Sequence, residues 1–360
     1  EKNYLKVIQL YKEQQDEISV INVYDALGSV YLKTGNLHKA EVNFLLALQY
    51  AKNHNISTSM SGICINLANL YLIEGKPNQV SNFLHEAKKF TENTVEDNQI
   101  LSVIITKAKL NFMRGYFKKA MKCLKKGNKL EDMSFHVDNR AEFNLEAAKI
   151  RMNLGQVKIA TSLLFSIYKK KEITENLLIY CKINRILGKI HFFENSPQKA
   201  KIILKEAYKK LRTKKSFGYI FQSIIVDLIE INIMQNDHNK AYYWKKKLKQ
   251  HLQKYNIDLM NFINYRLQYV DFLSTYHKQN INIDKLLKFE TLLNKKNLIT
   301  LKYKVNLLKI RYLVDRDKIT DALQILKEVE ENSALRPNLI FQIQIQFLEG
   351  LILTRDFEFN

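Results

Sequence analysis

Residues 24–48 read YDALGSVYLKTGNLHKAEVNFLLAL, and residues 64–88, forty positions later, read CINLANLYLIEGKPNQVSNFLHEAK. Gly35 in the first stretch recurs every forty residues, as Gly75, Gly115 and Gly155. Self-similarity at a fixed period of this length is the signature of a stacked repeat protein. A single unit cannot bury its own apolar face, so neighbouring units must pack together to make the core.

Four more columns keep step with these glycines. Three hold mostly small residues, and one is always bulky and apolar. The small columns are Gly28, Ala68, Ala108, Ala148 and Gly188; Ala40, Val80, Ala120, Ala160 and Ala200; and Ala47, Ala87, Gly127, Ile167 and Ala207. The bulky column is Phe44, Leu84, Leu124, Leu164 and Leu204. Small residues let two helices approach closely, and large residues fill the space beside them.

Each unit is predicted to form two antiparallel helices joined by a tight turn. Tyr24, Leu27 and Tyr31 recur at three- and four-residue spacing, which marks one face of a helix. Gly35 then supplies the left-handed backbone conformation that ends this helix. Phe44 lies on the apolar face of the second helix, so the predicted fold class is all-α.

This pattern resembles the tetratricopeptide repeat family, on the residues Leu27, Gly28, Tyr31, Gly35, Ala40, Phe44 and Ala47. The resemblance implies a right-handed α-solenoid, which is a superhelix of stacked helix pairs. A typical member has about 34 residues per repeat, so a period of forty predicts helices longer by about a turn. Pro77 and Pro197 share one place after the turn, where proline can open a helix. HEAT-type repeats have a similar length but lack this Gly-to-Ala spacing.

One continuous array is predicted over residues 1–360, because three prolines and ten glycines leave no room for a flexible linker. The predicted units are 21–60, 61–100, 101–140, 141–180, 181–221, 222–265, 266–302 and 303–342, with partial units at 1–20 and 343–360. Neither end has an evident polar cap, so we expect the array to be cut at both ends. The sequence has no run of about twenty apolar residues, and no membrane span is predicted.

The net charge of +21 is unevenly distributed. Residues 1–100 hold 9 basic and 11 acidic residues, residues 101–260 hold 33 and 13, and residues 261–360 hold 15 and 12. Such asymmetry can mark a surface for an acidic partner. The competing interpretation is that lysine merely fills solvated positions, as in the runs 169–171, 209–215 and 245–247.

A candidate partner-binding ladder follows from the resemblance, because the first helix of each tetratricopeptide pair lines the concave groove. The predicted ladder residues are Asn66, Asn69, Lys109, Lys149, Lys182, Arg185 and Lys189. Three of the lysines would stand about 8–10 Å apart and repel one another modestly when no ligand is bound. An acidic segment or a free terminal carboxylate would relieve that repulsion. Carboxylate-clamp members of the family use Lys and Asn at such places, but Thr106 and Glu146 depart from the clamp set, so chance enrichment in lysine stays an alternative.

Catalysis is not predicted. The eight histidines are dispersed, and His191 is expected to be a core residue. No cofactor loop or metal-ligand spacing occurs, so no cofactor and no metal are predicted. Cys64, Cys123 and Cys181 are too few and scattered for a disulfide framework, which indicates a reducing, cytoplasmic setting. Lysines around Cys123 could lower its pKa, but the residue lacks a nearby histidine in the sequence.

The leading hypothesis is a non-catalytic protein–protein interaction scaffold that binds an extended partner segment in its groove. The resemblance extends to the arrays of maltose-regulator-type proteins, which implies a regulatory arm of a larger bacterial signalling or transcription-regulating protein. Nucleic-acid binding through the basic middle repeats is one alternative. A peptide or small-ligand sensor, or an array fused to a protease or defence effector, is another. The sequence does not decide the oligomeric state.

Overall fold

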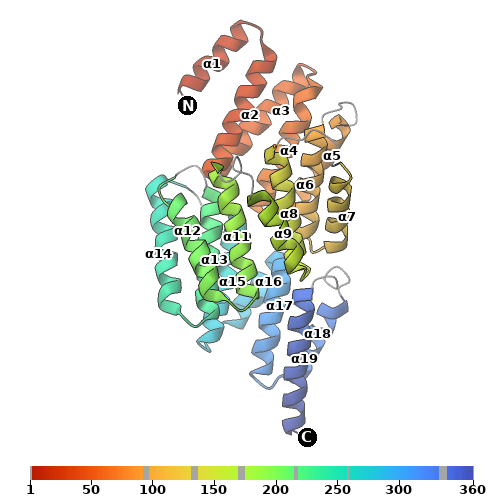
Figure 1. The fold of residues 1–360 in the computed structure, drawn as a ribbon, viewed down its shortest axis with the longest axis vertical. Helices are drawn as coiled ribbons and strands as arrows, with labels where there is room; N and C mark the ends of the chain where they lie inside the picture. The colour runs from red at the N-terminus through yellow and green to blue at the C-terminus, as the bar shows by residue number, and fades with distance from the viewer. Residues whose placement is uncertain are drawn as a thin grey trace.

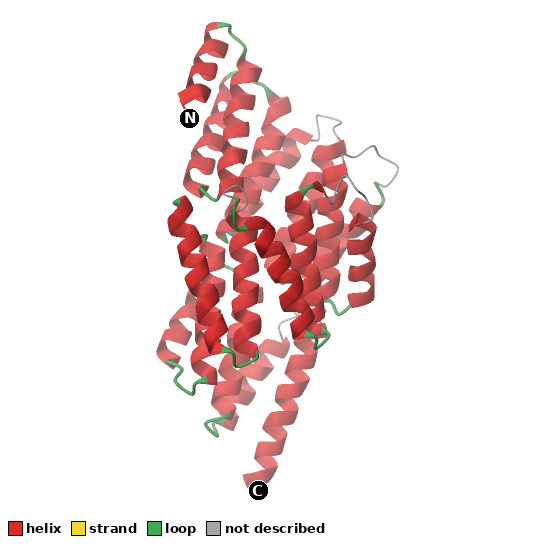
Figure 2. Ribbon diagram, turned by 60° about the vertical axis from the view of Figure 1, so that its left-hand side comes forward, coloured by secondary structure: helices red, strands yellow, loops and turns green. Residues whose placement is uncertain are grey.

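The computed structural model describes residues 2–91, 97–130, 137–168, 175–214, 218–257, 259–331 and 339–359. Within these ranges the chain forms eighteen helices and no strand (Figures 1 and 2). The predicted all-α fold class is therefore confirmed. None of the described helices is long and apolar enough to cross a membrane.

The helices form consecutive pairs, and in most pairs the two members pack closely against each other. The pair at residues 261–295 meets through the rings of Phe272 and Phe289, with centroids 5.6 Å apart. The first helices are α2 (Glu17–Thr34), α4 (Ser57–Glu74), α6 (Asp97–Met113), α8 (Val137–Asn153), α11 (Leu177–Phe193), α13 (Gly218–Met234), α15 (Asn261–His277), α17 (Ile299–Val314) and α19 (Leu339–Phe359). The second helices are α3 (Leu37–Asn53), α5 (Pro77–Thr91), α7 (Phe117–Asn128), α9 (Val157–Tyr168), α12 (Pro197–Leu211), α14 (His238–Tyr255), α16 (Ile283–Lys295) and α18 (Ile319–Glu331). Helix α1 (Lys2–Glu13) precedes α2 in the place of a second helix.

The period of the structure is the period of the sequence. First helices begin at residues 17, 57, 97, 137 and 177, at intervals of forty, and then at 218, 261, 299 and 339. Each predicted unit boundary lies inside a first helix, four or five residues after that helix begins. The sequence columns thus locate the packed centre of each unit rather than the helix start.

The turn glycines adopt the conformation that their column predicts. Gly35, Gly75, Gly115 and Gly155 have φ values of +89°, +70°, +74° and +75°. Where the column loses glycine, Asn195, Asn236 and Asp317 take the same left-handed conformation, which Asn and Asp tolerate better than most side chains. A second set of left-handed residues between units was not predicted, and it includes Gln15, Asn55, Asn256 and Asn297.

Small residues of the first column pack directly on the bulky column. A Cβ atom added to Gly28 would lie 2.5 Å from the ring of Phe44, and one added to Gly188 would lie 2.8 Å from Leu204. Phe44 and Leu204 are fully buried. The absence of a side chain at these glycines is therefore what allows the paired helices to approach this closely.

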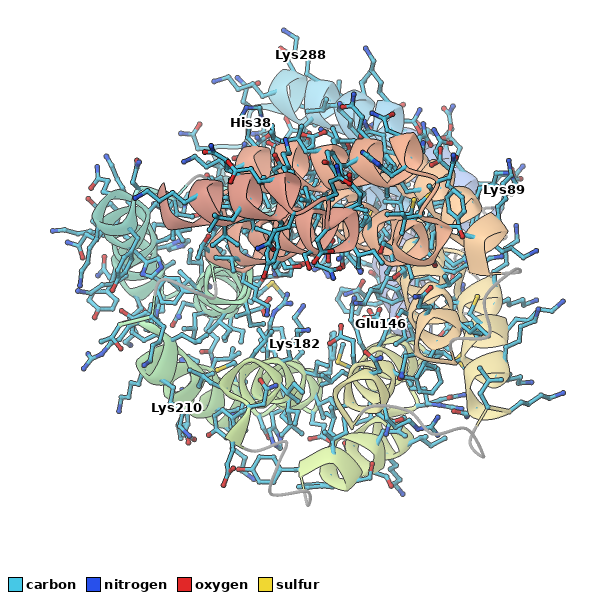
Figure 3. The ribbon with its side chains drawn as sticks, turned by 90° about the horizontal axis from the view of Figure 1, so that it is seen from above. His38, Lys89, Glu146, Lys182, Lys210 and Lys288 are labelled. Atoms are coloured by element: carbon cyan, nitrogen blue, oxygen red, sulfur yellow. The ribbon has the colours of Figure 1, made fainter. Side chains whose placement is uncertain are left out.

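The helix pairs follow one another around a common axis (Figure 3). After five first helices the path returns, so that α13 contacts α2, α15 contacts α4 and α17 contacts α6. The hydroxyl of Thr300 at the start of α17 donates to the carbonyl oxygens of Phe112 (3.2 Å) and Met113 (3.0 Å) at the end of α6. We call this row of contacts the seam. The chain termini lie at opposite ends of the molecule (Figure 1).

Candidate binding surface on the inner helices

The first helices present polar side chains toward the common axis. Figure 3 shows Lys182 and Glu146 directed to the centre, whereas Lys89, Lys210 and Lys288 on second helices are directed outward. We call the axis-facing side of the first helices the inner surface.

Helix α11 supplies three of the predicted ladder residues, which are Lys182, Arg185 and Lys189. Its start is fixed by Asn176, whose side-chain oxygen accepts hydrogen bonds from the backbone N–H groups of Leu178 (3.1 Å) and Ile179 (3.3 Å). This is the ordinary N-cap role of asparagine. Because the three basic residues recur at three- and four-residue spacing, they share one face of α11.

Glu142 on α8 joins two neighbouring helices. It accepts hydrogen bonds from the Nζ of Lys109 on α6 (2.7 Å) and the Nζ of Lys182 on α11 (2.5 Å). Burial alone would raise the pKa of Glu142, but the two ammonium groups hold that pKa well below its usual range. Glu142 is therefore ionised at neutral pH and bridges three successive units.

Asp227 is the centre of a second cluster. It lies on α13, a helix with apolar residues on nearly every side, and only 2% of its side chain is exposed. It accepts from Arg185 Nε (2.6 Å) and Arg266 Nη2 (2.5 Å), and Lys189 Nζ lies 3.4 Å away. Burial opposes ionisation of Asp227, yet these cations lower its pKa strongly. A buried carboxylate of this kind is stable only because it is paired.

Glu230, one turn after Asp227, extends this cluster to α17. Its carboxylate accepts from Arg266 Nη2 (3.2 Å) and from Lys304 Nζ (2.7 Å). Burial raises the pKa of Glu230, but Lys304 and Arg266 outweigh burial and bring the pKa to about 2. Lys304 also lies over the ring of Tyr269, 5.3 Å from its centroid. We call the charged side chains around Glu142, Asp227 and Glu230 the inner charge network.

Lys189 has the weakest contact in this network. Burial is the largest influence on it, and the neighbouring charges of Arg185 and Arg266 further oppose the attraction of Asp227. Together they lower the pKa of Lys189 to about 7. Three cationic side chains share the single carboxylate of Asp227, so Lys189 is the member with the least compensation.

The remaining ladder residues lie on earlier first helices. Asn66 donates to the carboxylate of Asp25 (2.9 Å), and the hydroxyl of Thr106 donates to Asn69 at 3.5 Å. Lys149 donates to Glu146 (3.0 Å). All seven predicted ladder residues thus lie on first helices. Six of them make polar contacts with the neighbouring unit, and Lys149 pairs within its own helix.

The prediction that three ladder lysines repel one another is wrong, because each of them has a carboxylate beside it. Lys109 is paired with Glu142, Lys149 with Glu146, and Lys189 is beside Asp227. Glu142 also pairs with Lys182, so it neutralises two of the ladder lysines. Carboxylates on neighbouring inner helices reach the lysines, because an inner position faces the equivalent position of the next unit as well as its own helix.

The sequence analysis did not identify four members of the network, which are Asp227, Glu230, Arg266 and Lys304. A usable signal was present. Lys182 follows Glu142 by 40 residues, Arg185 precedes Asp227 by 42, and Arg266 follows Asp227 by 39. In a forty-residue array, opposite charges at such offsets predict ion pairs across units.

Two expectations about reactive groups also change. His191 is not a core residue, since 30% of its side chain is exposed and its Nδ1 lies 3.2 Å from Glu194. Cys123 is buried, and desolvation raises the pKa of its thiol in spite of the neighbouring lysines. Burial likewise raises the pKa of Cys64 and Cys181 to about 12. Among the described residues, no group of three or more His, Cys, Asp or Glu side chains could hold a metal ion.

Comparison with known proteins gives one family. Residues 6–182 match a family described as "Uncharacterized protein conserved in bacteria (DUF2225)". The matched stretch includes the Glu142 cluster but ends before Arg185 and Asp227, and the family description names neither a repeat type nor an activity. No match was found among curated proteins.

Proposed function

We propose that this chain is a tetratricopeptide-type, right-handed α-solenoid that acts as a non-catalytic protein-interaction scaffold. The forty-residue spacing of the first helices supports this fold, as do the left-handed turn residues and the packing of Gly28 on Phe44. The partner is an extended acidic segment of another protein, bound along the inner surface.

The surplus of positive charge around Lys189 carries this proposal. Four basic side chains (Arg185, Lys189, Arg266 and Lys304) share two carboxylates (Asp227 and Glu230). The cluster therefore carries two uncompensated positive charges when Lys189 is protonated and one when it is not. An incoming carboxylate would supply a charge-assisted hydrogen bond to the least satisfied member. It would also stabilise the protonated form of Lys189, which burial disfavours.

The seam favours an extended segment over a folded domain. Contacts between α2 and α13, α4 and α15, and α6 and α17 close the wall of the inner surface between successive turns. A single chain needs little width and can lie along the axis. Two carboxylates of a short acidic peptide could then reach Lys189 and Lys304 at the same time.

The wider biological role rests on the resemblance and on the bacterial family match. We propose that the array is a cytoplasmic regulatory arm of a bacterial signalling or transcription-regulating protein. A sensor that binds a peptide or small acidic ligand is the neighbouring hypothesis. A change of molecular dimensions on ligand binding, measured by small-angle scattering, would favour the sensor.

Binding of a fluorescein-labelled, fifteen-residue polyglutamate peptide tests the proposal. We compare the wild type with Lys189→Gln on the inner surface and with Lys288→Gln, which points outward. Loss of one charge-assisted hydrogen bond should lower affinity about tenfold or more in Lys189→Gln, and Lys288→Gln should bind like the wild type. Equal affinities for all three proteins would overturn the assignment of the inner surface.

A further inference from the structure

The lysine excess is concentrated on particular second helices. Helix α7 has five lysines and no acidic residue, α12 has five lysines and one glutamate, and α14 has six lysines and no acidic residue. Helix α18, in the same place of a later unit, has one lysine and four acidic residues. A uniform bias toward lysine in the composition does not produce this difference.

Helices α12 and α14 are neighbours and form one surface. The ring of Tyr208 on α12 packs edge-on against Trp244 on α14, with centroids 4.9 Å apart. Figure 1 shows the two helices side by side at the left, and Figure 3 shows Lys210 of α12 directed away from the axis. The charge of both helices therefore faces outward on the same side of the molecule.

Equivalent positions on the two helices carry matching residues. The two helices begin 41 residues apart, and at that offset Lys205 on α12 corresponds to Lys246 on α14, and the exposed Ile202 corresponds to the exposed Tyr243. Ile202 and Tyr242 are 65% and 71% exposed. We call Lys199, Lys205, Lys209, Lys246 and Lys249, together with Ile202, Tyr242 and Tyr243, the outer basic surface.

The lysines of this surface differ from those of the inner charge network. All five are exposed, and within the part of the chain that the structure describes none has a carboxylate partner. Nearby lysines outside the set are paired, since Lys240 contacts Asp237 and Lys245 contacts Asp271. The outer basic surface thus carries lysine charges that no carboxylate neutralises. Because these side chains are exposed, their ammonium groups stay hydrated in the free protein.

Exposed aromatic rings accompany the charge. Tyr242 and Tyr243 are 71% and 50% exposed, although aromatic side chains in this protein mostly lie within the packed units. Lys247 lies 5.4 Å from the centroid of the Tyr243 ring, and this ring packs edge-on against Trp244 with centroids 5.2 Å apart. Exposed rings beside unpaired lysines suit a ligand that has both phosphates and stackable bases.

We propose that the outer basic surface binds single-stranded nucleic acid. The five lysines contact successive phosphates, and Tyr242 and Tyr243 stack on bases. A flexible strand can follow the surface across α12 and α14, and its unpaired bases are free to stack on exposed rings, which a duplex or a bilayer surface does not offer. Lysines that contact phosphates carry no base-specific information, so binding should tolerate many sequences.

Fluorescence anisotropy with labelled twenty-nucleotide oligothymidylate and oligouridylate tests this. Five phosphate contacts on a single strand predict a slope of about −3.5 for the logarithm of affinity against the logarithm of salt concentration. Affinity should therefore fall roughly a hundredfold between 50 and 200 mM salt. The double variant Lys205→Glu/Lys246→Glu should bind at least tenfold more weakly and reduce the magnitude of the slope by about 1.4.

The matched control is Lys89→Glu/Lys288→Glu, which changes the net charge equally at two outward-facing positions elsewhere. It should bind within about twofold of the wild type. Tyr242→Ala should lose about fivefold or more and Tyr242→Phe should retain affinity, because stacking needs only the ring. An equal loss in the control pair would overturn the site. Tighter binding to phosphatidylserine vesicles than to either oligonucleotide would overturn the ligand class.

Discussion

Gly35 and Gly218 lie against each other although 183 positions separate them in the sequence. A Cβ atom added to Gly35 would be 3.7 Å from the Cα atom of Gly218, and one added to Gly218 would be 3.1 Å from the carbonyl oxygen of Thr34. The turn after α2 therefore rests on the first residue of α13. This contact begins the seam, which continues where Gly75 meets Leu298 and ends where Thr300 bonds to the end of α6.

Substitution of Gly218 should loosen the seam. In Gly218→Val the new side chain meets backbone atoms of Thr34 and Gly35, which cannot turn aside as a flexible side chain would. We expect a loss of about 1–3 kcal/mol in the free energy of unfolding, in the range of overpacked sites, and a larger radius of gyration in small-angle scattering. Gly62→Ala is the control, because an added Cβ there meets nothing within 4 Å. If both variants keep wild-type dimensions and stability, the seam does not hold the turns together.

The Gly28–Phe44 pair offers a double-mutant cycle. Gly28→Ala places a methyl group 2.5 Å from the Phe44 ring, and Phe44→Leu leaves a cavity. Each change alone should cost about 1–3 kcal/mol in the free energy of unfolding. The double variant recreates the Ala68–Leu84 combination of the next unit, so its loss should be smaller than the sum of the single losses. Strict additivity in chemical denaturation would contradict direct packing of the two columns.

These contacts show how far the sequence predicts the fold. Gly35 and its column predict each turn, because a left-handed residue is required wherever the first helix ends. The seam could not be predicted. The seam forms because a small rotation from each unit to the next adds up over five units. The local sequence around Gly218 or Thr300 does not indicate this total rotation.

The inner surface was predicted in part for a related physical reason. Lys109, Lys149 and Lys189 were placed by one column, and their position on first helices agrees with it. Their partners lie in different columns of neighbouring units, as Asp227 shows. The single residue added between α11 and α13, whose starts are 41 apart, also moves Asp227 and Glu230 out of the forty-residue register.

Asp227→Asn should be the most damaging single change in the inner charge network. The carboxylate is almost completely buried and balances Arg185, Lys189 and Arg266. Its removal leaves cations without compensation, which costs about 3–5 kcal/mol when one partner of a buried ion pair is lost. Lys189→Met removes a surplus cation and should leave the denaturation midpoint near that of the wild type. A milder effect of Asp227→Asn than of Lys189→Met would contradict the charge balance described above.

His251 should make the fold sensitive to acid. Its ring stacks on Phe221 at 3.6 Å between centroids, and burial lowers its pKa to about 4. The unfolded chain protonates this histidine near its ordinary pKa of about 6.5, so stability is lost as pH falls from about 6.5 toward 4. His251→Phe keeps the stacking and removes the titration. Its thermal midpoint should fall less than that of the wild type between pH 7 and pH 4.5, and parallel curves would rule out this role.

Peptide binding at the inner surface should weaken above pH 7. The charges that face Lys189 come from Arg185 on its own helix, Asp227 and Glu230 on α13 and Arg266 on α15, and with burial they set its pKa near 7. A bound carboxylate favours the protonated form, so affinity for polyglutamate should fall by up to about tenfold per pH unit above 7. Lys189→Arg keeps its charge throughout and should bind with little pH dependence. A Lys189→Arg variant that repeats the wild-type pH profile would assign the titration to another group.

Photo-crosslinking from the inner surface tests the scaffold proposal most directly. Tyr219 is partly buried on α13, about two turns before Asp227 on the same helix, and benzoylphenylalanine can replace its aromatic ring. Tyr242 on the outer basic surface is the matched position. In source cells we predict that position 219 captures one acidic protein segment, identified by mass spectrometry, and that Lys189→Gln abolishes this product while position 242 does not form it. Protein crosslinks from position 242 with none from position 219 would contradict the account.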